Sequence, residues 1–434
     1  MTGTPKTLGA LALLTAALPV NAALTAVALL RGLVVPPCRA RAADPKTILI
    51  SGGKMTKALQ LARTFHRAGH RVVLVETAKY RWTGHRFSRA VDRFHIVPPP
   101  GTSGYAQALL EIVRGEDVDV YVPVCSPAAS QHDADATALL SAHCEVLHAD
   151  PGTVRMLDDK FAFSAAAAEL GLPVPAHHRI QDPSEVVVAA AQAGGPFVLK
   201  SIPYDPVNRL DLTPLPRPTR EKTEAFAAAR PISPDTPWIL QGLVEGAEFC
   251  THSTVRDGVV TAYCCCPSSA FQVNYAMVDK PAIEAWVKRF VSESGITGQV
   301  SFDFIEAADG TPYAIECNPR THSAITLFHD QPEQLARAYL EDGAPEVRPL
   351  PTACPTYWLY HEVWRLLTAR GRRAETVRTI LRGTDAIFDW DDPLPFLLVH
   401  HAQIPSLLLA SLRARKDWIR IDFNIGKLVE AAGD

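Results

Sequence analysis

The sequence has little excess of either charge. Its 434 residues carry 43 Lys and Arg against 46 Asp and Glu, a formal net charge of −3. Without a global basic field, nucleic acid is not an expected partner. The nine cysteines include no Cys-x-x-Cys pair, which argues against a zinc ribbon or a disulfide framework and suits a reducing compartment. The G-x-G-x-x-G dinucleotide fingerprint is also absent.

The composition is that of a folded chain. Hydrophobic residues make up 47% and charged residues 21%, which excludes a disordered protein. The length predicts about three domains at roughly 150 residues each.

An uncharged apolar segment stands near the start of the chain. No residue from Thr7 to Leu30 is charged, and most are Leu, Ala or Val, enough for one membrane-crossing helix that Pro19 and Asn21 weaken. Basic residues from Arg31 onward predict that the rest of the chain stays in the cytoplasm. Three interpretations of residues 1–45 stay open: an anchor on or in the inner face of the membrane, a cleaved signal peptide, or a non-spanning apolar helix.

The next segment predicts a βαβ unit. A strand over 47–51, a helix over 55–68 and a Val-rich strand over 71–76 follow one another, and this order is typical of a parallel sheet. Ser51-Gly52-Gly53-Lys54 lies at the first strand's end. A nucleotide at this helix start is one interpretation; a tight turn that seats the helix is the favoured one.

Further elements follow from the pattern of apolar residues. We expect helices over 153–170 and 184–193, strands over 197–200 and 238–243, a proline-rich loop over 203–237, and a hairpin of 248–255 with 259–266.

The most informative segment is a second hairpin around Asp309-Gly310, a strong two-residue turn signal. With that turn, Ala308 faces Thr311, and Asp303 lies directly opposite Glu316 on one sheet face. Asn318 and Arg320 continue this face at a period of two residues. The other face is apolar and is expected to pack on the core through Phe302, Phe304, Ile315 and Cys317.

Two opposed acids repel each other, so a cation is expected between them. The oxygens of Asp303, Glu316 and Asn318 suit Mg²⁺, which takes phosphate oxygens and waters as its other ligands. The alternative is a solvated polar face on which Arg320 neutralises one acid. Lys160 and Lys200 become candidate clamps for nucleotide phosphates if the metal is present, because ammonium groups bind phosphate as point charges; alone, Lys200 would be a snorkelling surface residue.

This combination resembles the ATP-grasp superfamily over about 150–330. The motifs that carry the resemblance are Asp159-Lys160, Gly171-Leu-Pro-Val-Pro175, Phe197-Val-Leu-Lys200, Ile239-Leu-Gln-Gly-Leu-Val-Glu-Gly-Ala-Glu-Phe249, Asp303 and Glu316-Cys-Asn-Pro-Arg320. With the apolar N-terminus, the chain is also similar over nearly its whole length to the mycosporine-glycine synthases. That closer similarity rests on four stretches, 48–63, 385–396, 399–405 and 418–427.

The resemblance implies a fold and its domains. The class is α/β, with α+β character in the ATP-grasp part: an apolar segment (1–45), a Rossmann-like domain (46–150), a two-lobed ATP-grasp domain (151–335, with the lobes meeting near 243) and a helical C-terminal extension (336–434).

The resemblance also implies ATP and Mg²⁺ as cofactors and a role for each site residue. Lys160 and Lys200 would contact phosphates, Gln241 and the Val244 backbone adenine, and Glu248 the ribose. Asp303, Glu316 and Asn318 would hold the metal, and Arg320 would steady the transferred phosphoryl group or the acceptor.

Two features depart from the superfamily pattern. Residues 201–220 contain no glycine where a glycine-rich loop usually closes over the phosphates, and only Arg209, Arg217 and Arg220 offer substitutes. The adenine hinge has Gln241-Gly242 where an acidic residue is common.

The implied reaction is phosphorylation of the enol oxygen of 4-deoxygadusol followed by displacement of phosphate by the amine of glycine. The expected partners are therefore these two small molecules. The acceptor pocket is expected near Arg320, His322 and Ser323, with His252 and Tyr263. Two other hypotheses remain: another ATP-grasp carboxylate–amine ligase, such as a dipeptide ligase, and a membrane-associated ATP sensor without turnover.

Overall fold

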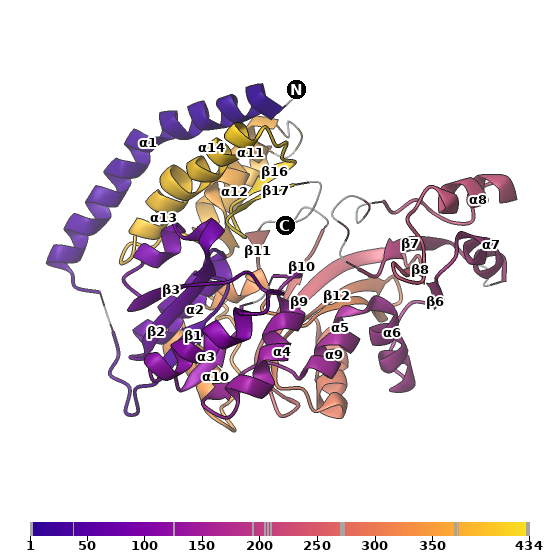
Figure 1. Ribbon diagram of the computed structural model, residues 1–434, viewed down its shortest axis with the longest axis horizontal. Coiled ribbons are helices and arrows are strands. Elements are labelled where there is room, and N and C mark those ends of the chain that lie inside the picture. Colours follow the sequence, from indigo (N-terminus) through magenta and orange to yellow (C-terminus); the bar gives the residue numbers. More distant parts are fainter. Residues whose placement is uncertain are drawn as a thin grey trace.

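The computed structural model describes residues 3–37, 39–124, 126–192, 195–203, 205, 208, 211–269, 274–368, 371 and 373–430. Figure 1 shows a parallel sheet with helices on its faces, a long antiparallel sheet beside it, a small lobe at one end, and a helical layer at the other. The α/β class with an α+β part is confirmed.

The first unit is a five-stranded parallel sheet in the order β3-β2-β1-β4-β5. Its elements are β1 (Thr47–Ile50), α2 (Thr56–Arg67), β2 (Arg71–Thr77), β3 (Arg93–Val97), α3 (Tyr105–Gly115), β4 (Val120–Val122), α4 (Ser130–Leu140) and β5 (Glu145–Val146). The predicted βαβ unit is therefore correct. Gly52 has φ +67°, and a Cβ there would lie 2.1 Å from the Val124 carbonyl oxygen, so the turn before α2 needs glycine for packing alone.

The expected single helix over 153–170 is wrong, because Asp159 divides it. The chain forms α5 (Pro151–Asp158) and α6 (Lys160–Glu169), and the Asp159 carboxylate accepts the amide hydrogens of Phe161 and Ala162 as an N-cap. This break places Lys160 at the first position of α6. Asp159 in turn accepts a hydrogen bond from Arg179, which lies on the small lobe's sheet.

The small lobe is a three-stranded antiparallel sheet in the order β6-β8-β7. Its elements are β6 (His177–Ile180), α7 (Pro183–Gln192), β7 (Phe197–Ser201), α8 (Arg220–Ala228) and β8 (Trp238–Gly242). Helix α8 lies inside the proline-rich segment 203–237, where a loop was expected. The Thr219 hydroxyl caps this helix by accepting from the Lys222 amide.

A four-stranded antiparallel sheet in the order β10-β9-β12-β13 carries the two acids. It consists of β9 (Gly246–Arg256), β10 (Val259–Pro267), β12 (Gly298–Ala307) and β13 (Pro312–Asn318), with α9 (Pro281–Ser294) on one face. The β9–β10 hairpin is confirmed: Asp257 and Gly258 form a two-residue turn, both with positive φ. Under α9 the rings of Trp286, Phe290 and Phe302 pack together, which fixes that face of the sheet.

The C-terminal part returns to the first unit. It comprises η3 (Ser323–Phe328), α10 (Pro332–Leu340), α11 (Leu359–Thr368), α12 (Arg373–Arg382), α13 (Leu394–Leu398), η5 (Val399–Gln403) and α14 (Ile404–Ala414). Two small sheets contain the short strands β11 (Asn274–Tyr275), β14 (Thr356–Tyr357), β15 (Thr384–Asp385), β16 (Arg420–Asp422) and β17 (Lys427–Val429), and two 3₁₀ turns, η1 (Ala78–Tyr80) and η2 (Gly84–Phe87), follow β2. One hydrophobic core joins residues of α2 and β1 to residues of η3, α10, η5 and α14.

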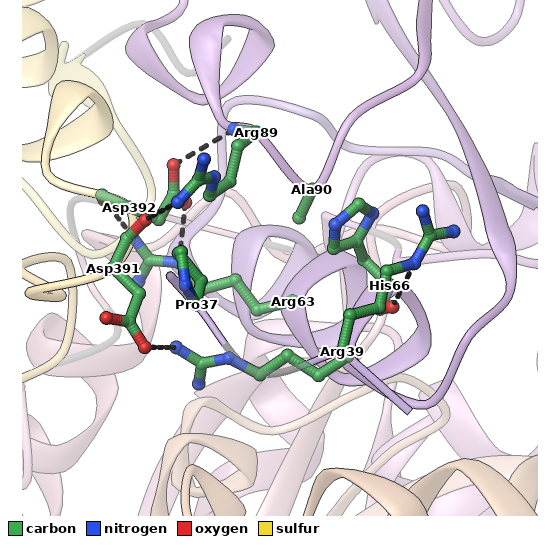
Figure 2. A pocket seen from close by; sticks show the side chains of 9 residues that line it. Pro37, Arg39, Arg63, His66, Arg89, Ala90, Asp391 and Asp392 are labelled. Carbon is green, nitrogen blue, oxygen red and sulfur yellow. Dashed lines mark hydrogen bonds and ion pairs between the residues drawn. The ribbon is translucent and has the colours of Figure 1, made fainter. Parts of the chain in front are cut away.

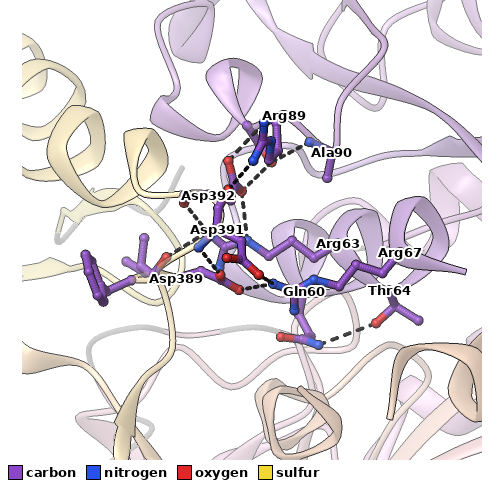
Figure 3. A network of polar contacts seen from close by, with 12 residues as sticks. Gln60, Arg63, Thr64, Arg67, Arg89, Ala90, Asp389, Asp391 and Asp392 are labelled. Carbon is purple, nitrogen blue, oxygen red and sulfur yellow. Dashed lines mark hydrogen bonds and ion pairs between the residues drawn. The ribbon is translucent and has the colours of Figure 1, made fainter. Parts of the chain in front are cut away.

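A buried ionic network fastens the C-terminal part to α2 (Figure 3). Arg63 pairs with Asp392 at 2.9 Å, and each of the two side chains is only 5% exposed. Asp392 also accepts from the Ser88 hydroxyl and the Arg89 amide. Arg67 pairs with Asp389 at 2.6 Å. Figure 2 shows the small cavity beside these pairs, lined by Arg39, His66 and Asp391 among others.

The first helix, α1 (Gly3–Val34), continues through Pro19 and lies along the outer side of α13 and α14 (Figure 1). By length and hydropathy, Thr4–Val34 and Leu394–Ala414 are both long and apolar enough to cross a membrane, and 22% and 44% of their most apolar windows are buried. Asn21 makes a hydrogen bond with Tyr360 and a second with His401.

We predict that Asp392→Ala destabilises the protein by about 3–5 kcal/mol, because it leaves the buried Arg63 guanidinium without its carboxylate. Urea unfolding followed by circular dichroism measures the loss. Glu341→Ala is the matched control, since Glu341 pairs with Arg337 at the surface and its removal should cost less than about 1 kcal/mol. Equal stability of Asp392→Ala and wild type would contradict this role of the network.

Candidate active site

The two acids of the second hairpin lie directly opposite each other, as expected. Asp303 pairs with Glu316, and Ser301 with Asn318, on adjacent antiparallel strands β12 and β13. The expected two-residue turn is nevertheless wrong. Ala307 faces Thr311, so the loop has three residues, and Gly310 takes φ +85°.

A β-bulge restores the register between the turn and the acids. The pairing shifts by one residue between Asp303 and Phe304, so that Phe304 faces Ala314 instead of Ile315. Ala314 therefore joins the core with Phe302, Phe304 and Cys317, and the expected core position of Ile315 is wrong. Ile315 is the extra residue of the bulge, and its carbonyl accepts a hydrogen bond from Gln241 Nε2 at 3.0 Å.

Two lysines from different elements approach the acids. Lys160, at the start of α6, places Nζ 3.5 Å from Glu316 Oε2. Lys200, on β7, donates from Nζ to Gln241 Oε1 at 3.0 Å. Burial lowers the pKa of Lys200, and the nearby Lys160 lowers it further, while Glu316, Asp303 and Glu248 raise it. The lysine expected to bind phosphate is thus held close to three acids and a second cation.

The side-chain amide of Gln241 connects the two lobes by hydrogen bonds. Its amide oxygen accepts from Lys200 on β7, and its amide nitrogen donates to the bulge carbonyl on β13. The side chain is buried, at 1% exposure, with both ends of its amide engaged. In this arrangement Gln241 positions Lys200. Its expected contact with adenine would require the amide to give up one of these bonds.

Burial, together with the charges of Glu316 and Glu248, raises the pKa of Asp303 to about 7, against the opposing effect of Arg320 and Lys200. A divalent cation between Asp303 and Glu316 would relieve this repulsion. The donors are all oxygen, which fits Mg²⁺ and its preference for one or two carboxylates plus waters and phosphates. Among the described residues no three His, Cys, Asp or Glu side chains form a complete metal cage. The acids therefore fit a magnesium ion whose remaining ligands come from solvent and substrate.

Asn318 and Arg320 continue the acid face. Asn318 donates from Nδ2 to Asp303 Oδ2 at 3.3 Å, and its Oδ1 accepts from Arg320. Arg320 also pairs with Asp158 at 3.3 Å. Asn318 Oδ1 must leave Arg320 to serve as a metal ligand, which would free the guanidinium for an anion.

His322 and His252 meet just beyond the acids. The His322 amide donates to His252 Nδ1 at 3.3 Å, and His322 Nδ1 accepts from the Ala324 amide, so His322 caps η3. Burial, with the charges of Lys57 and Arg320, lowers the pKa of His322 to about 3. Both rings are therefore neutral at pH 7.

Tyr263 is not part of this group, so its expected place in the acceptor pocket is wrong. It pairs with Ser253, whereas Cys264 pairs with His252. Because neighbouring strand residues point to opposite faces, Tyr263 lies on the α9 side of the sheet, in the aromatic core.

The other predicted residues lie at the edge of the group. Val244 is half-buried in the connection between β8 and β9. Glu248 is exposed on β9 opposite Ile305 and accepts from the Ser268 hydroxyl at 3.5 Å. Of the suggested lid arginines, Arg209 lies outside the described residues, Arg217 contacts the Pro214 carbonyl, and Arg220 pairs with Glu224 on its own helix.

Three residues near this face were missed. Lys57, in the first turn of α2, is buried and donates from Nζ to the Thr321 carbonyl at 2.6 Å. The hydroxyls of Ser301 and Thr321 are buried and have no hydrogen-bond partner in the described part of the chain. The period of two from Asp303 back to Ser301 is the sequence signal for the serine. No comparable sequence signal identifies Lys57, because its position depends on how α2 packs on the sheet.

Comparisons with solved structures identify the fold. A structure of PurK, N5-carboxyaminoimidazole ribonucleotide synthetase, with ADP has a TM-score of 0.58 and 18% identity, covering 77% of this chain and 87% of that one. The biotin carboxylase domain of Hydrogenobacter thermophilus 2-oxoglutarate carboxylase, solved with MgADP, ADP and bicarbonate, has a TM-score of 0.55 and 13% identity, covering 69% and 70%. N5-carboxyaminoimidazole synthetase from Staphylococcus aureus with ADP gives 0.54 and 15%, covering 74% and 82%.

No protein-family profile matches the sequence, and no curated protein sequence matches it. At these identities the structural similarity defines the fold alone. The chain has the fold of the ATP-grasp enzymes.

We predict that Asp303→Asn stabilises the nucleotide-free protein at pH 8. A raised pKa means that the folded state binds more protons than the unfolded state between about pH 4 and 7. The stability from this group is present below pH 4 and is lost as the pH rises through 7. Replacement of the carboxylate should therefore gain on the order of 1 kcal/mol at pH 8, and less at pH 5.

Thermal unfolding at pH 5 and pH 8 measures this difference. Glu306→Gln is the control, because Glu306 lies on the same strand and pairs with Lys280 away from the acids. A wild type and an Asp303→Asn variant whose melting temperatures change equally with pH would show that Asp303 is ionised in both states.

Proposed function

We propose that the protein is an ATP- and magnesium-dependent ligase that joins 4-deoxygadusol to glycine to form mycosporine-glycine. The observation that carries the ligase proposal is the pair of opposed acids Asp303 and Glu316, with Lys160 and Lys200 reaching them from two other elements. A solvated polar face fits less well, because Lys160 and Glu316 are only 17% and 32% exposed and Arg320 contacts Asp158 and Asn318 instead of either opposed acid.

The choice of substrates rests on the four stretches similar to mycosporine-glycine synthases, and their packing supports it. The first stretch, 48–63, contains α2. Its Arg63 pairs with Asp392 in the second stretch, and its Thr56 amide donates to the Asn424 carbonyl in the fourth. Gln403, in the third, donates to the Gly426 carbonyl. The stretches therefore form one packed unit around α2, beside Lys57 and Thr321.

Each residue of the site then has a role. Lys160 and Lys200 bind the phosphates of ATP, Gln241 holds Lys200, Val244 and Glu248 lie where adenine and ribose would bind, and Arg320 steadies the transferred phosphoryl group. Asp303 and Glu316, with Asn318, hold the magnesium ion, which when bound neutralises charge on the phosphate oxygens.

The chemistry needs two displacements. The enol oxygen of 4-deoxygadusol attacks the γ-phosphorus, the bond to the bridging oxygen breaks, and ADP leaves. The amine of glycine then adds to the ring carbon that carries the phosphate, loses a proton, and expels inorganic phosphate. In this proposal the acceptor binds near His322, His252 and Ser323, beside the buried hydroxyls of Ser301 and Thr321, for which the described residues supply no hydrogen-bond partner. Use of ATP would be consistent with a cytoplasmic location for the residues after the first helix.

We predict that phosphate release depends on 4-deoxygadusol and glycine together and matches formation of an ultraviolet-absorbing product one for one. Glu316→Gln should lower kcat at least 100-fold, because one metal-binding charge is lost. Glu306→Gln, with the same chemical change on the neighbouring strand, should keep wild-type kcat.

Other acceptors separate the alternatives. Phosphate release with two amino acids but not with 4-deoxygadusol would indicate a dipeptide-type ligase. ATP binding without turnover by any acceptor would indicate a sensor. Full activity of Glu316→Gln would contradict the site itself.

We predict that His322→Asn raises the KM for 4-deoxygadusol about tenfold with little change in the KM for ATP. Asparagine keeps an N-cap acceptor for η3 while it removes the ring. His322→Ala should add a loss of stability of about 1 kcal/mol, since the cap is then lost as well. Steady-state kinetics and thermal unfolding of both variants separate the two effects, and an unchanged KM in His322→Asn would exclude the ring from the acceptor pocket.

A further inference from the structure

The side of α1 that faces the protein holds three polar residues, Thr7, Asn21 and Thr25, together with Leu14 and Ala28, and the side that faces outward is mostly apolar. The outward face carries large apolar side chains over its whole length, among them Leu8, Leu13, Val20, Val27, Leu30 and Leu33, of which Val20 is 71% exposed. Together with Leu18 and Leu29, which are also exposed, these positions span about 220° of the helix circumference at 3.6 residues per turn. An exposed apolar surface of this extent marks an interaction site.

Polar contacts hold α1 to the C-terminal part at both ends and in the middle. Lys6 donates to the Trp418 and Ile419 carbonyls at 2.9 and 2.7 Å, and the Trp418 indole donates to Thr7. Asn21 donates to Tyr360 at 2.6 Å, and Arg31 pairs with Asp391 at 2.8 Å. These contacts span some 25 residues, or about 37 Å of helix. A helix that crosses a bilayer could not keep them, because their partners belong to the enzyme's C-terminal region.

The surroundings of the apolar face are cationic. Arg413, Arg415, Lys416 and Arg420 are exposed on and after α14, next to the Lys6 end of α1, against one exposed acid in that stretch, Asp417. Apolar side chains accompany them, with Leu409 and Ile419 40% and 49% exposed. At the other end Trp390 is exposed beside the Arg31–Asp391 pair. Cations and tryptophan around an uncharged apolar surface match the headgroup region of an anionic bilayer.

We propose that α1 lies in the plane of an anionic lipid bilayer, docked on α13 and α14, and that its outward face with Leu409, Ile419 and the four cations forms a membrane-binding face. The chain is then attached to one leaflet, as amphipathic interfacial helices are, and does not span the membrane. A second copy of the chain is a less suitable occupant, because its uncharged apolar face would offer nothing to the cations beside α1, whereas an anionic bilayer binds both the apolar side chains and the cations. The proposal does not depend on the identity of the ligase substrates.

Vesicle co-sedimentation of the full chain tests the occupant. Vesicles of phosphatidylcholine with 30% phosphatidylglycerol should bind the protein at least tenfold more tightly than vesicles of phosphatidylcholine alone. Val20→Glu with Val27→Glu should abolish binding, and Arg413→Gln with Lys416→Gln and Arg420→Gln should weaken it at least tenfold on anionic vesicles only. Val188→Glu is the control, since Val188 on α7 is 53% exposed, close to the 55% of Val27, and this variant should bind as wild type does.

Topology is tested by a protease-cleavable tag before residue 1 in membranes from an expressing bacterium. An in-plane helix leaves the tag cleavable in inside-out vesicles and protected in right-side-out ones. The opposite pattern would show a spanning helix and overturn the proposal. Folded wild-type protein that binds neither the anionic nor the pure phosphatidylcholine vesicles would also overturn the proposal. So would a dimer of the wild type that Val20→Glu with Val27→Glu dissociates.

Discussion

The repulsion between two carboxylates on adjacent strands is the constraint on which the candidate site depends. Asp303 and Glu316 are fixed opposite each other by the β12–β13 ladder, whose other face is buried against α9, so neither can turn away without exposing aromatic side chains. Three cations from different elements lie close enough to offset this repulsion: Lys160 from α6, Lys200 from β7 and Arg320 after β13. Such a site suits a divalent cation and a polyanion. The cation would offset the two opposed carboxylates, and the polyanion would offset the three neighbouring cations.

The hairpin shows how far local sequence rules reach. The sequence correctly predicts a hairpin around Arg256-Asp257-Gly258, and its turn consists of Asp257 and Gly258, both with positive φ. The same dipeptide at Asp309-Gly310 forms a three-residue loop. The opposed acids were nevertheless predicted correctly, because a bulge at Ile315 compensates for the longer loop. Two departures from the expected geometry cancelled. A bulge depends on what its extra carbonyl can bind, here Gln241 from a strand 74 residues earlier, and no local pattern contains that partner.

Contacts with distant parts of the chain also explain the other differences between the sequence-based predictions and the structure. The apolar pattern over 153–170 reads as one helix, yet Asp159 caps a second one and so directs Lys160 toward Glu316. Alternation along β10 correctly predicts a buried strand but not which face meets the acids, and Tyr263 was assigned to the wrong one. Lys57 reaches Thr321 only because α2 packs against η3. Elements and register follow from near neighbours in the sequence, whereas a site assembled from several elements follows from packing.

The C-terminal region links the two ends of the molecule. Its Asp392 binds Arg63 of α2, its Asp391 binds Arg31 of α1, and its Tyr360 binds Asn21 of α1. Helix α1 and helix α2, which carries Lys57, are therefore both held by one segment of chain. That segment contributes none of the residues assigned to nucleotide or metal. Its Asp392 instead pairs with the buried Arg63, and such a buried pair fixes geometry better than it adds stability. We infer that the region serves to set α2 against the sheet, so that the acceptor and the phosphates meet at the opposed acids.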